Sequence, residues 1–213
     1  MGRRRPATIA SCGGESSVCG TGFLRLFSAA YDGDLQIVDS SSIRVHQHAS
    51  NVKRGGVQAG AVTGDVAEAR CMGRSRGGLT TKIHALVDAN GLPVALKLTE
   101  GQAHDGRNAA DMLGNIGAGQ ILLADRAYDS DGLRNELADR GAWANVKPLA
   151  RRINVPVFSR FLYRYRNLVE RFFNKLKHFR AVATRFEKHD ANYLALIKLA
   201  AARIWMRANE SVS

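Results

Sequence analysis

A single acid lies in the basic stretch Tyr163-Arg-Tyr-Arg-Asn-Leu-Val-Glu170-Arg-Phe-Phe-Asn-Lys-Leu-Lys177. Glu170 is the only acidic residue between Asp139 and Glu187, and twelve Lys and Arg surround it there. At about 100° per residue, a helix over this stretch has one polar and one apolar side. We therefore expect one carboxylate on a cationic helix face. A single acid among basic residues suggests a metal ligand at a place that a phosphate group must approach. The polar stripe holds Tyr163, Arg166, Glu170, Asn174 and Lys177, and the apolar side holds Leu162, Leu168, Val169, Phe172, Phe173, Leu176 and Phe179.

The composition indicates a globular protein that contacts nucleic acid. The chain has 213 residues, of which 45% are hydrophobic, so it can bury a full core as one or two domains. Its formal net charge is +12 and its pI is about 10.2, a balance typical of nucleic-acid-binding proteins. Cys12, Cys19 and Cys71 lack zinc-like spacing and are expected to be reduced thiols in the cytoplasm.

The N-terminal part of the chain is organised differently from the rest. Residues 1–34 mix Gly, Ser, Cys and Arg without a clear period, which predicts poor order. Residues 51–78 are rich in Gly, Arg and Lys and are expected to form a loop. The apolar segment Tyr193–Met206 is interrupted by Lys198 and Arg203, so it predicts a buried or amphipathic helix and no membrane span.

Residues 35–207 predict alternating strands and helices. Strands are expected at 35–39, 80–87, 93–98, 120–124 and 143–146, with an Asp88-Ala-Asn-Gly91 turn between the second and third. Helices are expected at 108–116, 130–140, through Glu170, and from Asp190 to about Arg207. Ser130 would cap the second helix and Gly141 would end it. This order predicts the α/β class.

Two aspartates follow apolar runs that read as strands. Asp39 ends Leu35-Gln-Ile-Val-Asp39, and Asp125 follows Gln120-Ile-Leu-Leu-Ala124. Because neighbouring strands lie about 4.8 Å apart, acids on adjacent strands can share a metal ion, and a helix over the sheet would add Glu170. Three carboxylates suit Mg²⁺, and two such ions support phosphodiester displacement. Asp32 or Asp34 could replace Asp39, and Asp129 or Asp131 could replace Asp125; an ion-paired Glu170 is the alternative on the helix.

Four motifs resemble the insertion-sequence DDE transposases, in the group typified by insertion sequence five within the insertion-sequence-four superfamily. They are Val38-Asp39-Ser-Ser-Ser-Ile-Arg-Val-His46, Gly77-Gly-Leu-Thr-Thr-Lys82-Ile-His84 with Gly101-Gln-Ala-His104-Asp105, Leu123-Ala-Asp125-Arg-Ala-Tyr128-Asp129, and the spacing Tyr163-x₂-Arg166-x₃-Glu170-x₆-Lys177. Together they extend from residue 35 to about 207.

The resemblance implies an RNase H-like catalytic domain over residues 35–208, with a tail at 209–213. Its central mixed sheet would have three antiparallel strands followed by parallel strands, flanked by helices. Asp39, Asp125 and Glu170 would be the catalytic and metal-binding triad, holding two Mg²⁺ ions for which Mn²⁺ substitutes. This triad would cleave DNA at element ends and join the freed 3′ ends to a target, in a bacterial, nucleoid-associated protein acting as a homodimer.

Basic residues around the triad are candidates for DNA contact. The resemblance implies that Tyr163, Arg166 and Lys177 contact DNA near the active site. Arg151, Arg152, Arg160 and Arg164 are expected to follow the DNA backbone, and Lys82 to line the groove. His46, His48, His84 and His104 are not assigned to a metal. Arg126 and Tyr128 are candidates for supporting the Asp125 loop.

Residues 1–34 do not resemble the helical region that begins the relatives' chains and is thought to recognise their terminal inverted repeats. The sequence therefore leaves three functions open. The first is a DNA transposase. The second is a truncated, non-catalytic DNA-binding fragment that regulates a full-length transposase. The third is a simple RNase H-like nuclease, which would cleave DNA without joining its ends to a target.

Overall fold

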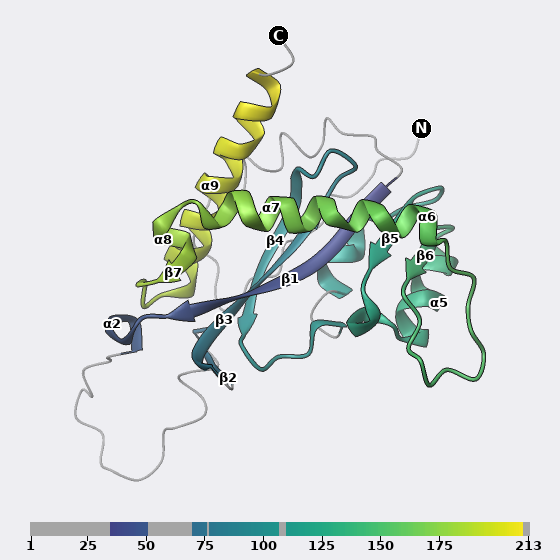
Figure 1. Ribbon diagram of the computed structural model, residues 1–213, viewed down its shortest axis with the longest axis horizontal. Coiled ribbons are helices and arrows are strands. Elements are labelled where there is room, and N and C mark those ends of the chain that lie inside the picture. The colour runs from purple at the N-terminus through teal and green to yellow at the C-terminus, as the bar shows by residue number, and fades with distance from the viewer. Residues whose placement is uncertain (1–34, 51–69, 76, 107–109, 211–213) are drawn as a thin grey trace.

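The computed structural model describes residues 35–50, 70–75, 77–106 and 110–210. The expectations for residues 1–34, 51–69 and 211–213 lie outside these residues, as do the alternative acids Asp32 and Asp34. In the described part, helices cover both faces of one seven-stranded sheet (Figure 1). No helix there has the length and apolar content needed to cross a membrane.

The sheet is mixed, as the sequence predicted. Strands β1 (Leu35–Val45), β3 (Gly78–Val87) and β4 (Pro93–Glu100) are antiparallel neighbours. On the other side of β1, strands β5 (Ile121–Ala124) and β6 (Trp143–Val146) run parallel to it. The spatial order is therefore β4-β3-β1-β5-β6, with β1 in the centre.

The β3–β4 turn follows from its sequence. The Asp88 carboxylate accepts hydrogen bonds from the backbone N–H groups of Asn90 and Leu92, each at 2.8 Å. Gly91 has φ of +74°, a left-handed conformation that glycine adopts without a Cβ penalty. The predicted Asp88–Gly91 turn is therefore confirmed.

Side chains alternate between the two faces of the sheet and build a core on each. On one face, Ile37, Ile43 and Leu123 pack with helices α7 (Asn167–Lys177) and α9 (Asp190–Glu210). On the other face, Val38, Leu122 and Ala124 pack with the 3₁₀ helix η1 (Ala110–Asn115) and with α5 (Asp131–Asp139). The Ser130 hydroxyl accepts from Leu133 N–H and caps α5 as predicted.

Several elements differ from the expectations. Strand β1 continues through the serines after Asp39 because they pair with β3, so Asp39 lies within a strand and not at its end. The expected 51–78 loop contains β2 (Gly73–Ser75), which pairs with β3. Strand β7 (Thr184–Arg185) was not predicted. The helix expected at 108–116 is the shorter η1, and the last helix extends to Glu210.

The expected Glu170 helix consists of three successive pieces. They are α6 (Arg160–Tyr163), the 3₁₀ turn η3 (Arg164–Arg166) and α7, with α8 (Arg180–Ala183) following. Two short elements complete the described fold, α2 (Gln47–Ser50) and η2 (Arg126–Tyr128). The apolar side of α7 is buried as predicted, at Val169, Phe172, Phe173 and Leu176.

Candidate active site

Asp39 and Asp125 lie at the same level of two adjacent parallel strands. The β1–β5 register pairs Ile37 with Leu123, and each aspartate follows two residues later in its own segment. Strand β5 ends at Ala124, so Asp125 lies directly beyond its carboxyl end. Both side chains are partly buried. The sheet therefore brings two carboxylates from distant parts of the sequence side by side.

Arg166 connects the helix acid to the strand acid. Its Nη1 donates to Asp39 Oδ2 at 2.8 Å, and its Nη2 donates to Glu170 Oε1 at 2.7 Å. The Asp39 side chain is 16% exposed and the Glu170 side chain 55% exposed, so the pair spans from the sheet to the surface. The ion-paired Glu170, which the sequence offered as the alternative to a metal ligand, is present in this structure, and Asp39 shares the same arginine.

Electrostatic effects at Asp39 oppose one another. Burial raises the pKa of this carboxyl above its ordinary value, and the nearby Asp125 charge acts in the same direction. The Arg166 guanidinium and the Ser40 N–H favour the ionised form, but burial outweighs them. A positive charge at this position thus offsets much of the cost of a partly buried carboxylate.

One oxygen of Asp125 is available to a ligand. Oδ1 accepts from the Ala127 N–H at 2.8 Å and caps the turn η2. Within the described residues, Oδ2 receives no hydrogen bond. The local turn therefore fixes the carboxylate and leaves an unused acceptor on the side chain.

Asp129, one of the alternatives to Asp125, has a structural role. Its carboxylate accepts from Arg134 Nε at 2.9 Å, from Arg152 Nε at 2.6 Å and from Leu149 N–H at 2.8 Å. The side chain is fully enclosed. Burial alone would raise the pKa of Asp129, but these three donors lower it below the ordinary value. With both of its oxygens used, this carboxylate ties the 147–152 segment to α5.

This arrangement assigns Arg152 differently from the sequence analysis. Arg152 donates to both Asp129 and Asp131, each at 2.6 Å, so its guanidinium is held against protein carboxylates instead of facing solvent. Asp131, the other alternative to Asp125, is exposed and occupied by this contact. Contact of Arg152 with the DNA backbone stays a prediction, but carboxylates hold its Nε and Nη1. Arg151 and Arg164, by contrast, are exposed.

We expect Asp129→Ala to lower the free energy of unfolding by about 3 kcal/mol, because two arginines lose their enclosed counter-charge. The difference from wild type should be full near neutral pH. It should vanish as pH falls through the lowered pKa of Asp129, because the wild-type carboxylate is then protonated. Urea unfolding at several pH values measures it, with the exposed Asp139→Asn as control. A loss below about 1 kcal/mol at pH 7 would contradict the structural role.

A fourth acid, Asp105, contacts the residue after Asp39 and was not predicted as functional. Asp105 Oδ1 accepts from the Ser40 hydroxyl and from Lys82 Nζ, each at 3.0 Å. Lys82 also donates to the Ala103 carbonyl at 2.7 Å, so it supports Asp105 and does not line an open groove. The motif that contains Asp105 was visible in the sequence, but no local pattern indicated its contact with the residue after Asp39.

The remaining candidates divide by exposure. Tyr163 is half-buried, with Lys147 and Arg166 about 5.7 and 5.8 Å from its ring centre, and Lys177 is exposed. Burial, the largest influence, raises the pKa of the Tyr163 hydroxyl. His84 is buried, bonds Thr99 at 2.8 Å, and has its pKa lowered to about 4, chiefly by burial. Tyr128 is buried beneath the Asp125 turn, and Arg126 is exposed.

Arg166 contacts two of the three predicted carboxylates, Asp39 and Glu170, and Asp125 lies beside Asp39 on the neighbouring strand. Within the described residues, no three His, Cys, Asp or Glu side chains are close enough together to hold a metal. The donor set itself fits a hard divalent cation, since Asp39, Asp125 and Glu170 offer carboxylate oxygens and Asp125 has an unused one. Arg166 supplies the positive charge that such an ion would otherwise bring.

Comparison with known proteins identifies the family. The family model described as "Transposase DDE domain" matches residues 30–205. The chain belongs to the DDE transposase family. A putative transposase for insertion sequence element IS6501 from Brucella ovis is 42% identical over 130 residues, covering 61% of this chain and all of that protein. A putative transposase for insertion sequence element IS402 from Burkholderia cepacia is 32% identical over 147 residues, covering 62% and 67%.

The DDE transposase fold is RNase H-like, and the β4-β3-β1-β5-β6 order of the described strands agrees with it. Solved structures with some likeness include a piggyBac transposase synaptic complex with hairpin DNA (10% identity, TM-score 0.40) and a Mos1 paired-end complex with the left transposon end (15%, TM-score 0.33). The likeness covers 59% and 71% of this chain. The chain spans a quarter of the first protein and about half of the second.

Proposed function

We propose that this insertion-sequence transposase cleaves DNA at the ends of its element and transfers the freed 3′ ends to target DNA. The observation that carries the proposal is the contact of one arginine with both Asp39 and Glu170, beside an Asp125 on the neighbouring strand. These contacts support the assignment of Asp39 and Glu170, which are far apart in sequence, to one site with Asp125. Three carboxylates that share one cationic neighbourhood are the kind of donor set that a hard divalent cation binds, which supports the proposal.

Asp39, Asp125 and Glu170 would hold Mg²⁺, in a two-ion site that also accepts Mn²⁺. Bound there, the ions would polarise the phosphodiester and stabilise the attacking and leaving oxygens. The protein contributes a fixed pair of strand carboxylates and a third that is exposed on α7. Arg166 would have to move away from Asp39 before an ion could contact both Asp39 and Glu170. Released, its guanidinium matches the geometry of a DNA phosphate.

The surrounding residues position the substrate. Tyr163 presents a half-buried ring beside Arg166, suited to stacking on an unpaired base. Arg151, Arg164 and Lys177 are exposed cations that would contact phosphates without reading sequence. Asp105 and Lys82 lie behind Ser40 and would hold the Asp39 backbone segment in place. We place the reaction on DNA in the bacterial cytoplasm, with two copies of the chain acting together.

The second candidate is a DNA-binding fragment without catalysis, which inhibits or pairs with a longer transposase. The contact between Arg166 and Asp39 favours this candidate, because a guanidinium bound to Asp39 keeps a metal ion from this carboxylate. This candidate predicts salt-sensitive DNA binding and no strand cleavage at any Mg²⁺ or Mn²⁺ concentration. A simple nuclease would cleave but would not join ends to a target.

Incubating the purified chain with labelled DNA that carries the element ends separates the three functions. We expect strand cleavage with Mg²⁺ or Mn²⁺, joined products when target DNA is added, and neither product in EDTA. Restoring Mn²⁺ after EDTA should restore both, which controls for irreversible unfolding. Cleavage that persists in EDTA would contradict the metal-dependent mechanism, and the absence of cleavage in all metals would favour the regulatory fragment.

A further inference from the structure

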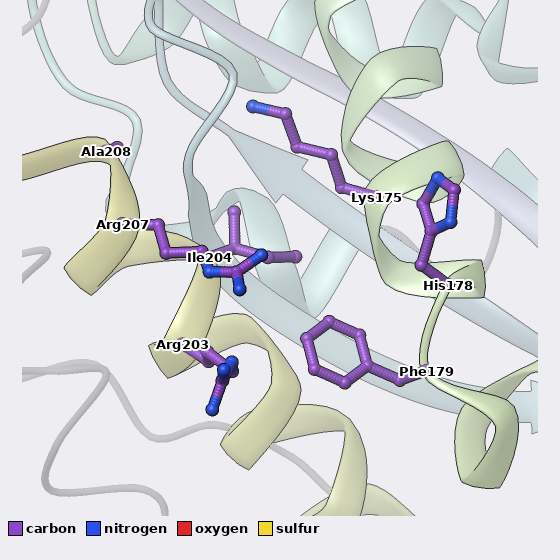
Figure 2. Close-up of a pocket in the computed structure, with 7 residues that line it drawn as sticks. All are labelled: Lys175, His178, Phe179, Arg203, Ile204, Arg207 and Ala208. Atoms are coloured by element: carbon purple, nitrogen blue, oxygen red, sulfur yellow. The ribbon is translucent and has the colours of Figure 1, made fainter. Parts of the chain in front are cut away.

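A cationic groove lies between α7 and α9, apart from the acids. Its volume is about 650 Å³, and α7 and α9 face each other across it (Figure 2). Phe179 and Ile204 form an apolar floor, and cationic side chains surround it (Figure 2). Among the described residues, no Asp or Glu lines this groove, and Glu210, three residues beyond Arg207, is not part of its lining. The lining residues are Lys175, His178, Phe179, Arg203, Ile204, Arg207 and Ala208.

Within the described part of the chain, no carboxylate neutralises the positive charge of this groove. Lys175, Arg203 and Arg207 are exposed, and none forms an ion pair within the described residues. By contrast, Arg134, Arg152 and Arg166 each contact a carboxylate. Three like charges around one cavity repel one another, so the arrangement is stabilised when an anion enters.

Helix ends alone do not account for the cluster. Cations are favoured in the last turn of a helix, which explains Lys175 on α7 and Arg207 on α9 taken singly. Arg203 lies seven residues before the end of α9, beyond the reach of that effect. In addition, the cationic residues of the cluster come from two helices, α7 and α9, which lie next to each other only in the tertiary fold.

We propose that this groove binds the sugar–phosphate backbone of a DNA segment other than the one at Glu170. The inference takes DNA as ligand, as the proposed function does, but it does not require cleavage. Exposed cations on an open surface suit an extended polyanion, and the apolar floor suits the faces of the sugars. At about 100° per residue, Lys175 lies roughly 140° around α7 from Glu170, so the groove and the acids face different sides.

The test compares two triple variants that remove equal charge. Lys175→Gln/Arg203→Gln/Arg207→Gln changes the groove. Arg44→Gln/Arg74→Gln/Lys188→Gln changes exposed cations outside it that form no ion pair within the described part of the chain. Dissociation constants for a mixed-sequence duplex are measured in EDTA over a range of KCl. Because all six side chains are exposed, thermal unfolding should be close to wild type in both.

In the groove variant, we expect the slope of log K against log [salt] to become shallower by about 2 to 3, since each lost phosphate contact contributes about 0.9. The control should change the slope by less than about 1. Equal slopes in the two variants, or a groove variant indistinguishable from wild type, would overturn the proposal and assign the groove to another ligand. Because metal is absent, the result stands apart from the cleavage assay.

Discussion

Asp125→Asn is expected to lower metal-dependent strand cleavage by about a thousandfold. That factor corresponds to roughly 4 kcal/mol of transition-state stabilisation, the several kcal/mol that a bound divalent ion supplies. The amide keeps an oxygen that accepts the Ala127 N–H, so the turn after β5 is retained. What is lost is the charged oxygen that receives no hydrogen bond within the described residues.

The expected loss applies to the other two acids as well. Glu170→Gln and Asp39→Asn should lower the cleavage rate to a similar extent, although Asp39→Asn also weakens the Arg166 contact. Asp139→Asn is the matched control, because Asp139 is an exposed acid on α5. Cleavage is followed under single-turnover conditions with saturating DNA. Rates within about threefold of wild type for Asp125→Asn and Glu170→Gln would remove these acids from the chemistry.

Arg166→Gln should change metal affinity and cleavage in opposite directions. Without the guanidinium, Asp39 and Glu170 lack their nearby positive charge, so a divalent ion no longer competes with it. We expect Mn²⁺ to bind the DNA-free protein about tenfold more tightly, a change of about 1.4 kcal/mol. Cleavage should nevertheless fall by a hundredfold or more, because the released Arg166 would otherwise hold a phosphate.

The control for Arg166 is Arg171→Gln on the same helix. Arg171 is exposed and forms no ion pair with any described residue, so its replacement removes equal charge from α7 without changing the acids. Mn²⁺ binding should then be close to wild type. If Arg166→Gln weakens Mn²⁺ binding, the arginine supports the metal site instead of competing with the ion, and the displacement of Arg166 proposed above is wrong.

The sequence predicted the fold where a local pattern and the tertiary structure agree. The apolar run before Asp125 became β5, and the two-sided pattern around Glu170 became α7 with its apolar side buried. The predicted end of the first strand at Asp39 was wrong, because the three serines that follow look like a strand end. They continue the strand only because β3 pairs with them. A two-residue strand such as β7 carries no local signal at all.

Side-chain partners were less predictable than elements. Nothing near Arg152 in the sequence shows that Asp129, 23 residues earlier, will bind it; only the approach of the 147–152 segment to α5 does. The same holds for Asp105 and Ser40, which lie 65 residues apart. The sequence predicted that three acids form one site, but it did not reveal that Arg166 contacts two of them.

Electron paramagnetic resonance of Mn²⁺ shows whether Asp39, Asp125 and Glu170 hold divalent ions. The free ion gives a sharp signal that falls on binding, so affinity and stoichiometry are obtained for wild type, Asp39→Asn, Asp125→Asn, Glu170→Gln and the control Asp139→Asn. We expect wild type and the control to bind Mn²⁺ alike, and each of the other three variants to lose at least one ion or about tenfold in affinity. Equal binding by all five proteins would show that these carboxylates do not hold the metal.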